Sequence, residues 1–178
     1  MNVCNPLERT LRLALASEIP TLQALERAAD ARYAEVGRAD LIGDCIPTEV
    51  AQRAIQGEQL WICELEDGAL AGWALWAWVG DEHCLAQISV DPRYGRRGIG
   101  TALLTHGLER ARAVGETSVV LTTEREVPWC ARWYARHGFV IVPEDAWTPS
   151  MREITAQQQQ MGLDWSRRVH MRRVLTDA

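Results

Sequence analysis

One stretch of the chain combines the end of a strand, a loop rich in glycine and arginine, and the start of an amphipathic helix. It runs Ser89-Val90-Asp91-Pro92-Arg93-Tyr94-Gly95-Arg96-Arg97-Gly98-Ile99-Gly100-Thr101-Ala102-Leu103-Leu104. The first turn of a helix has unpaired N–H groups and a partial positive charge. Glycines let the backbone approach a ligand closely, and arginines add positive charge. The stretch therefore predicts a cradle for an anion, best suited to phosphate or pyrophosphate.

Two common phosphate-binding motifs are incomplete in this stretch. The dinucleotide fingerprint needs a third glycine, and Leu103 stands at that position. The nucleotide P-loop needs Gly-Lys-Ser/Thr, and the chain contains no lysine. Two other interpretations stay open from these residues alone. One is an exposed turn ahead of a basic helix with no ligand, and the other is a flavin or nucleotide held by the same cradle.

A second motif, Tyr134-Ala135-Arg136-His137-Gly138-Phe139, follows further along the chain. Together the two motifs resemble the GNAT superfamily of acyl-CoA-dependent N-acetyltransferases. That family has a strand, Gln/Arg-x-x-Gly-x-Gly/Ala and a helix, and later Tyr-x-x-x-Gly-Phe. Gly98 and Gly100 occupy the two small positions of the first motif. Two departures are Gly95 at the Gln/Arg position, and Val127-Pro128-Trp129-Cys130 where an Asn often opens the second helix.

The resemblance implies that acetyl-CoA is the acyl donor. No metal is expected, because the four histidines are scattered and form no ligand pair at helical spacing. By analogy with the family, backbone groups of Ile88, Ser89 and Val90 would hold the pantetheine arm. The pyrophosphate would be held by backbone amides of the following loop and helix start, namely Arg96, Arg97, Gly98, Ile99, Gly100 and Thr101. The acceptor amine would then attack the acetyl carbonyl directly in a ternary complex.

Proton transfers in such a reaction need an acid and a base. Tyr134 stands at the family's usual position for the acid that protonates the leaving thiolate. In several relatives a glutamate early in the strand before the loop is the base. Here Cys84 stands at that spacing, preceded by Glu82 and His83. The resemblance therefore makes Glu82 and His83 candidate bases, and histidine has the unperturbed pKa nearer neutrality.

Four other residues are secondary candidates for the chemistry. Glu124 and Glu126 follow the next predicted strand and are candidates to hold a water or the charge of the acceptor. A covalent acetyl-cysteine on Cys84 or Cys130 is the remaining route, and no Cys-His-Asp order supports it.

The elements that must position these residues follow from hydrophobic periodicity and turn signals. Strands are predicted over 9–14, 60–65, 69–79, 84–90, 118–123, 139–142 and 168–175, and helices over 17–36, 50–55, 98–114, 128–137 and 148–161. Ser17 and Thr48 are the expected caps of the first two helices. The short turns between residues 60 and 90 indicate an antiparallel meander.

The predicted fold is α/β (α+β), a single-domain GNAT-like mixed, mostly antiparallel sheet with helices on both faces. We expect one domain over residues 1–178, with a core over about 9–145 and a helix–strand extension over 146–178. The strand of the extension is expected either to complete the edge of the sheet or to pair across a homodimer.

Composition indicates a cationic acceptor. The chain has 24 Asp+Glu against 19 Lys+Arg, a formal net charge of −5, which argues against a nucleic-acid partner. Acidic residues flanking the first two helices include Glu35, Asp40 and Asp44, and the chain has eight tryptophans. Trp61, Trp76, Trp129 and Trp133 are candidates for an aromatic-lined pocket, since tryptophan can face a cationic amine.

The sequence thus favours a small-molecule amine as acceptor. A protein or peptide amine is the alternative, and a regulatory module that binds acyl-CoA without turnover is another. The five cysteines are widely spaced and form no Cys-x-x-Cys pair, so neither a zinc site nor a disulfide framework is expected. With no apolar run of ~18 residues and no secretory signal pattern, a cytoplasmic protein without a membrane partner is predicted.

Overall fold

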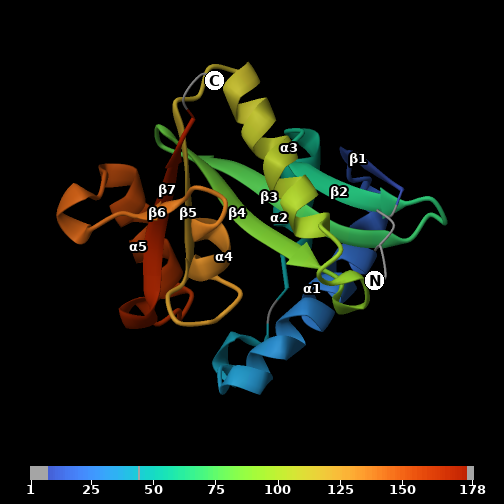
Figure 1. The fold of residues 1–178 in the computed structure, drawn as a ribbon, viewed down its shortest axis with the longest axis horizontal. Helices are drawn as coiled ribbons and strands as arrows, with labels where there is room; N and C mark the ends of the chain where they lie inside the picture. Colours follow the sequence, from blue (N-terminus) through green and yellow to red (C-terminus); the bar gives the residue numbers. More distant parts are fainter. Residues whose placement is uncertain (1–7, 44, 176–178) are drawn as a thin grey trace, which may run out of the picture. The chain divides into compact units, whose positions relative to one another are not determined.

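The computed structural model describes residues 8–43 and 45–175 of the 178-residue chain (Figure 1). Cys4 and Asp44 lie outside the described residues. The strands are β1 (Arg9–Leu13), β2 (Leu60–Leu65), β3 (Leu70–Val79), β4 (Glu82–Val90), β5 (Ser118–Glu124), β6 (Val140–Ile141) and β7 (Arg168–Val174). The α-helices are α1 (Ile19–Asp30), α2 (Thr48–Gln56), α3 (Ile99–Ala113), α4 (Ala131–Ala135) and α5 (Pro149–Gln160).

The strands form a seven-stranded sheet in the order β1-β2-β3-β4-β5-β7-β6, flanked by helices. The sheet is mostly antiparallel, and β4 pairs with β5 in parallel through Cys84↔Val120 and Leu85↔Leu121. The predicted mixed α/β fold class is therefore confirmed. None of the helices in the described part of the chain is both long and apolar enough to cross a membrane.

The chain divides into two compact units. The first takes the described residues up to Trp76 together with Gln87–Gly107, and the second takes Ala77–Ala86 together with the described residues from Leu108 onward. The expectation of one domain with a core and an extension stays a prediction.

In the first unit, helices α1 and α2 pack on β2 and β3. Leu22 and Leu25 of α1 lie in one core cluster with Leu60 and Ile62 of β2. Trp73 of β3 is fully buried in the same cluster, and its indole N–H donates to the carbonyl of Leu22 at 3.1 Å. This hydrogen bond satisfies the polar atom of a large core side chain, as a buried tryptophan requires. Trp73 is thus a core residue.

In the second unit, β7 lies between β5 and β6, and Figure 1 shows β7 running beside β5. The β5–β7 ladder extends from Ser118↔Val174 to Glu124↔Arg168, and β6 adds Val140↔Arg172 and Ile141↔Met171. The expectation that this strand completes an edge was therefore wrong, since it is an interior strand and β6 lies at the edge. Strand β7 pairs with a strand on each side, and local sequence patterns do not indicate which distant strands will pair.

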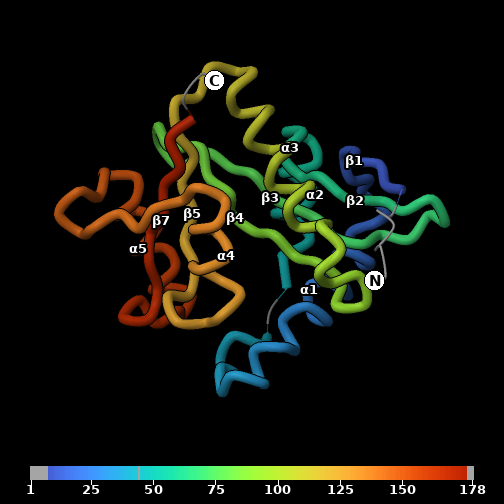
Figure 2. The backbone as a smooth tube through the Cα atoms, in the orientation of Figure 1, coloured from blue at the N-terminus to red at the C-terminus, as the bar shows by residue number. Residues whose placement is uncertain are grey.

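Helix starts and ends differ from their predicted positions for local reasons. Neither Ser17 nor Thr48 caps a helix: the N-cap of α1 is Glu18, and that of α2 is Pro47. The Glu18 carboxylate accepts from the Leu15 backbone N–H and from Arg12, which fixes the entry to the helix. After Asp30 the chain tightens into the 3₁₀ turns η2 (Ala31–Val36) and η3 (Ala39–Leu41), as the backbone trace shows (Figure 2).

Candidate active site

The loop between β4 and α3 is held in shape by its own side chains and backbone. It begins with the 3₁₀ turn η4 (Pro92–Tyr94), where the Asp91 carboxylate accepts from the backbone N–H of Arg93 at 2.9 Å. The guanidinium of Arg93 also donates to Asp91, with an Nη2–Oδ2 distance of 2.6 Å. This guanidinium holds the pKa of Asp91 below its ordinary value. Arg93, which we expected to add charge for an anion, is therefore already paired.

The second half of the loop adopts a backbone shape that glycine favours. Gly98 has φ +78°, and Arg96 has φ +59°, which is uncommon for a residue with a side chain. The guanidinium of Arg9, from β1, donates to the carbonyl of Arg97 at 3.1 Å and so ties the loop to the sheet. Arg96, Arg97 and Gly98 are exposed, whereas Ile99 is buried and anchors the start of α3.

The first turn of α3 sits directly against β3 because Gly72 has no side chain. A Cβ at Gly72 would lie 2.9 Å from the carbonyl oxygen of Ser89, 3.0 Å from Cγ2 of Ile99 and 3.2 Å from Cδ1 of Leu103. The contact with the Ser89 carbonyl is shorter than Cβ atoms show in real proteins, and the other two are tight enough that the Ile99 and Leu103 side chains would have to shift. The close approach of three segments therefore depends on the glycine.

This geometry suits a pyrophosphate. The N–H groups of the first helical turn have no partner within the helix, and the helix dipole adds positive charge at the same place. Arg96 and Arg97 supply two cations on an exposed loop. The residues present thus fit the diphosphate of coenzyme A. No group of three or more His, Cys, Asp or Glu among residues 8–43 and 45–175 is arranged to hold a metal ion.

The end of β4 offers a partly open strip ahead of this loop. Ile88 and Val90 are half-buried although β4 is an interior strand, and Ser89 between them is buried. The backbone N–H of Asp91 donates to the carbonyl of Ala71 at 3.0 Å, which keeps this end of β4 paired with β3. A strand with this pattern has one edge engaged and side chains still reachable by a ligand.

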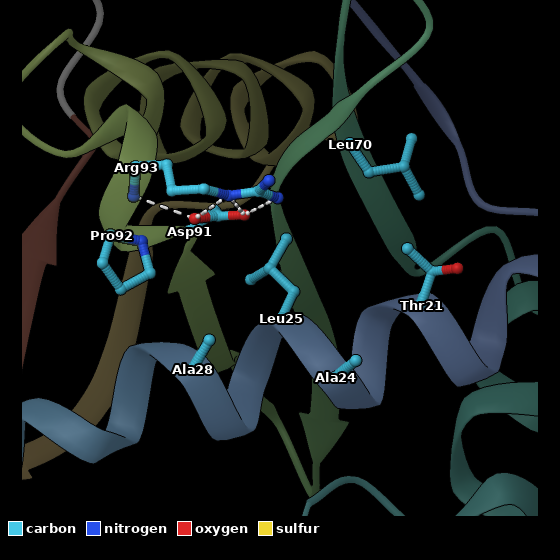
Figure 3. A pocket seen from close by; sticks show the side chains of 8 residues that line it. All are labelled: Thr21, Ala24, Leu25, Ala28, Leu70, Asp91, Pro92 and Arg93. Atoms are coloured by element: carbon cyan, nitrogen blue, oxygen red, sulfur yellow. Dashed lines mark hydrogen bonds and ion pairs between the residues drawn. The ribbon is translucent and has the colours of Figure 1, made fainter.

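A pocket of about 380 Å³ lies beside the loop, within the first unit (Figure 3). Its floor is one side of α1, and its upper wall is Pro92 with the Asp91–Arg93 pair. Figure 3 shows Leu25 pointing from α1 toward that ion pair. The lining residues are Thr21, Ala24, Leu25, Ala28, Leu70, Asp91, Pro92 and Arg93. Small side chains along α1 leave this space open next to the predicted diphosphate loop.

Tyr134 lies in α4 of the second unit, held between two aromatic rings. Its ring meets those of Trp133 and Phe139 edge to face, at centroid distances of 4.9 and 5.8 Å. Gly138, with φ +80°, reverses the chain so that the N–H of Phe139 donates to the carbonyl of Tyr134 at 3.2 Å. This explains the Tyr-x-x-x-Gly-Phe spacing physically, as a helix end closed by a left-handed glycine and a hydrophobic contact. Burial raises the pKa of Tyr134, which keeps its hydroxyl protonated.

The two candidate bases have different surroundings. Glu82 is 7% exposed, and its Oε1 accepts from the guanidinium of Arg172 and from the hydroxyl of Thr148 at 2.9 Å. It therefore joins β4 to β7 and to the N-cap of α5. The His83 ring stacks on Trp78 with centroids 4.6 Å apart, and burial lowers its pKa. Their roles as bases stay predictions.

The secondary candidates are also accounted for. Glu124 is 2% exposed and pairs with Arg168 at 2.6 Å, whereas Glu126 is exposed. Burial raises the pKa of Cys84 to about 12, so that thiol stays protonated at neutral pH and is a poor nucleophile. Cys130 is buried as well.

The residues proposed for an acceptor pocket are distributed over both units. In the first, the Trp61 ring lies 4.3 Å from that of His106, Trp76 is buried, and Asp40 accepts from Arg38 at 2.8 Å. In the second, Trp129 and Trp133 are half-buried. The predicted coenzyme-binding residues likewise all belong to the first unit, while Tyr134, Glu82 and His83 belong to the second.

One carboxylate that sequence reasoning missed lies against β4 in the first unit. Glu26 of α1 is 7% exposed and accepts from the backbone N–H of Ile46 at 2.8 Å and from Nε2 of Gln87 at 3.1 Å. The same Gln87 nitrogen lies 3.2 Å from the hydroxyl oxygen of Ser89. One signal in the sequence could have indicated Glu26, namely that a glutamate falls on the apolar side of the predicted first helix.

Residues 23–139, more than half of the chain, match the acetyltransferase (GNAT) family. The chain belongs to this family. Acetyl transfer from acetyl-CoA to an amine is the reaction of GNAT enzymes, and coenzyme A is present in several similar solved structures. The resemblance inferred from the two motifs is thereby confirmed.

Similar solved structures show the same fold at low sequence identity. N-acetylglutamate synthase from Neisseria gonorrhoeae, complexed with coenzyme A and N-acetyl-glutamate, is 23% identical with a TM-score of 0.71. The match covers 96% of this chain and only 36% of the synthase. The PaiA N-acetyltransferase from Thermoplasma acidophilum, in complex with coenzyme A, is 16% identical with a TM-score of 0.69, over 94% and 99% of the two chains. An Escherichia coli enzyme that acetylates an alanine of a ribosomal protein is 20% identical with a TM-score of 0.66, over 96% of both chains.

Proposed function

We propose that this GNAT chain transfers the acetyl group of acetyl-CoA to the primary amine of a small cationic molecule, by direct attack in a ternary complex. The observation that carries the proposal is the loop that precedes α3. Gly98 at φ +78° turns the chain into the first helical turn, next to the exposed Arg96 and Arg97. Such a turn binds a diphosphate through backbone N–H groups.

In this proposal each part of the chain has one task. Backbone groups of Ile88, Ser89 and Val90 orient the pantetheine arm, and the amides from Arg96 to Thr101 bind the diphosphate. Tyr134 gives its proton to the sulfur as the carbon–sulfur bond breaks, and its raised pKa keeps it in the protonated form that this task needs.

Charge supports a cationic acceptor over a neutral one. The chain has a formal net charge of −5. Carboxylates of the first unit include the buried Glu26 and the half-buried Asp30 one helical turn later. Negative potential around a site raises the local concentration of cations. A protein or peptide amine is the competing acceptor, because one enzyme of similar structure acetylates a ribosomal protein.

The test is acetyl transfer to a panel of primary amines and short peptides, followed by mass spectrometry of the products. Acetylated small amines would support the proposal, and acetylated peptides alone would replace the small molecule with a protein acceptor. Two variants locate the site: Gly98→Trp should abolish coenzyme A binding, and Tyr134→Phe should spare binding and slow turnover. Coenzyme A binding without product from any amine would indicate a binding module instead of an enzyme.

A further inference from the structure

Four carboxylates are buried in the described part of the chain, and one of them differs from the others. Glu82, Asp91 and Glu124 each pair with an arginine, namely Arg172, Arg93 and Arg168. Among residues 8–43 and 45–175, Glu26 accepts only from two neutral amides, the backbone N–H of Ile46 and the side chain of Gln87. Burying a carboxylate without a cation is costly, so such a group is seldom retained for structure alone.

The position of Glu26 places it against the strand that the proposed function assigns to the pantetheine arm. Gln87 and Ser89 alternate with Ile88 on β4 and therefore share one face of the strand. Gln87 Nε2 bridges the Glu26 carboxylate and the Ser89 hydroxyl, at 3.1 and 3.2 Å. Glu26 is thus two hydrogen bonds away from the side chain in the middle of that strip.

Resting on the proposed function, we propose that Glu26 accepts the proton of the acceptor amine, and that the ammonium group of the acceptor is the cationic partner of this carboxylate. Glu26 first takes one proton from the bound ammonium, directly or through one water, and this frees the nitrogen lone pair to attack the acetyl carbon. As the carbon–sulfur bond then breaks, the sulfur takes the proton of Tyr134, and the nitrogen loses one of its two remaining protons to water. Each carboxylate oxygen keeps a second lone pair beyond its hydrogen bond, so Glu26 retains the capacity to take a proton. Gln87 is the positioning residue that holds the carboxylate toward β4.

The charged surroundings of Glu26 agree with this role. Burial raises its pKa to about 7, close to the value that suits a base at neutral pH. On α1 itself Asp30 raises that pKa further and Arg27 lowers it, while the Ile46 N–H from the segment before α2 lowers it. From β4 the facing groups are the neutral Gln87 and Ser89. Below pH 7 the group is increasingly protonated and cannot act, so the rate should fall as the pH falls through about 7.

The decisive experiment compares Glu26→Gln with Glu109→Gln, which makes the same change at an exposed position of α3. With acetyl-CoA and the best amine of the panel, Glu26→Gln should lower kcat/KM at pH 8 by about 100-fold or more. It should also remove the fall in rate near pH 7, and leave coenzyme A affinity unchanged. Glu109→Gln should behave as the unmodified protein, and Glu26→Asp should keep the pH dependence with an intermediate rate.

The outcomes separate this inference from the proposed function. If the unmodified protein does not bind coenzyme A, the proposed function is overturned. Normal binding, with a Glu26→Gln variant that keeps the original rate and pH profile, would overturn only the role of Glu26. Should Glu26→Gln not fold, a ¹³C NMR titration of glutamate carboxyls in the unmodified protein, assigned with Glu26→Asp, decides instead. A Glu26 titration midpoint near 7 that shifts when the amine is added supports the inference, and a midpoint that does not change when the amine is added overturns it.

Discussion

Replacing Gly72 by alanine tests whether the close packing of β3, β4 and α3 positions the diphosphate loop. The new Cβ would lie 2.9 Å from the carbonyl oxygen of Ser89 and 3.0 Å from Cγ2 of Ile99. Relief of these contacts needs a displacement of about 0.5 Å, and the neighbours that must move are a strand backbone and a buried side chain. Overpacking of this kind costs ~1–3 kcal/mol of unfolding free energy.

The displaced segments are those assigned to coenzyme A, so binding should weaken together with stability. We expect the Gly72→Ala variant to bind coenzyme A about tenfold more weakly, or ~1.4 kcal/mol. Urea unfolding and calorimetric titration measure the two effects. Gly43→Ala is the matched control, because a Cβ there meets nothing within 4 Å and Gly43 does not have a positive φ. If Gly72→Ala matches Gly43→Ala in both assays, the packing argument is refuted.

Three further predictions concern buried groups. Arg172→Met leaves the Glu82 carboxylate buried beside Thr148 without its cation, and urea unfolding should show a loss of ~3 kcal/mol. Burial lowers the pKa of His170 to about 4. Between about pH 6.5 and 4, the His170 side chain is therefore protonated in the unfolded chain and neutral in the folded chain. The free energy of unfolding should therefore decrease as the pH is lowered through that window, and at pH 5 the His170→Gln variant should lack ~2 kcal/mol of this decrease. A variant with the same pH dependence as the unmodified protein would contradict the role given to His170. Gln87→Met removes a hydrogen bond that stabilises the charged form of Glu26, so the pH at which the transfer rate falls should move upward in the kcat/KM profile, and a downward shift would reject the positioning role.

Elements whose signals are local could be predicted closely from the sequence. The strand at Leu60–Leu65 was predicted at its observed bounds, because apolar alternation and the following turn both indicate it. The start of α3 was predicted within one residue because its glycines mark the entry to the helix. The Tyr134–Phe139 motif likewise depends on a contact between residues close in sequence.

Features that depend on distant residues were not predictable in the same way. The insertion of β7 between β5 and β6 pairs it with β5, from which the sequence separates it by α4, β6 and α5. The burial of Glu26 depends on Ile46 and on Gln87 of β4, and nothing local to α1 indicates either contact. The pairing of Arg93 has a local cause instead, since its partner Asp91 is only two residues away and an aspartate before a proline turn often accepts from the backbone that follows.

The interior position of β7 also governs the order in which the second unit can be assembled. Strand β5 presents Val119, Val120 and Leu121, all buried in the final structure, and its ladder partner is synthesised after α4, β6 and α5. Until β7 docks, β5 has an open hydrogen-bonding edge, and such edges pair readily with strands of other chains. During synthesis or refolding, dimers and aggregates formed at this edge would compete with correct closure, and the competition would grow with protein concentration.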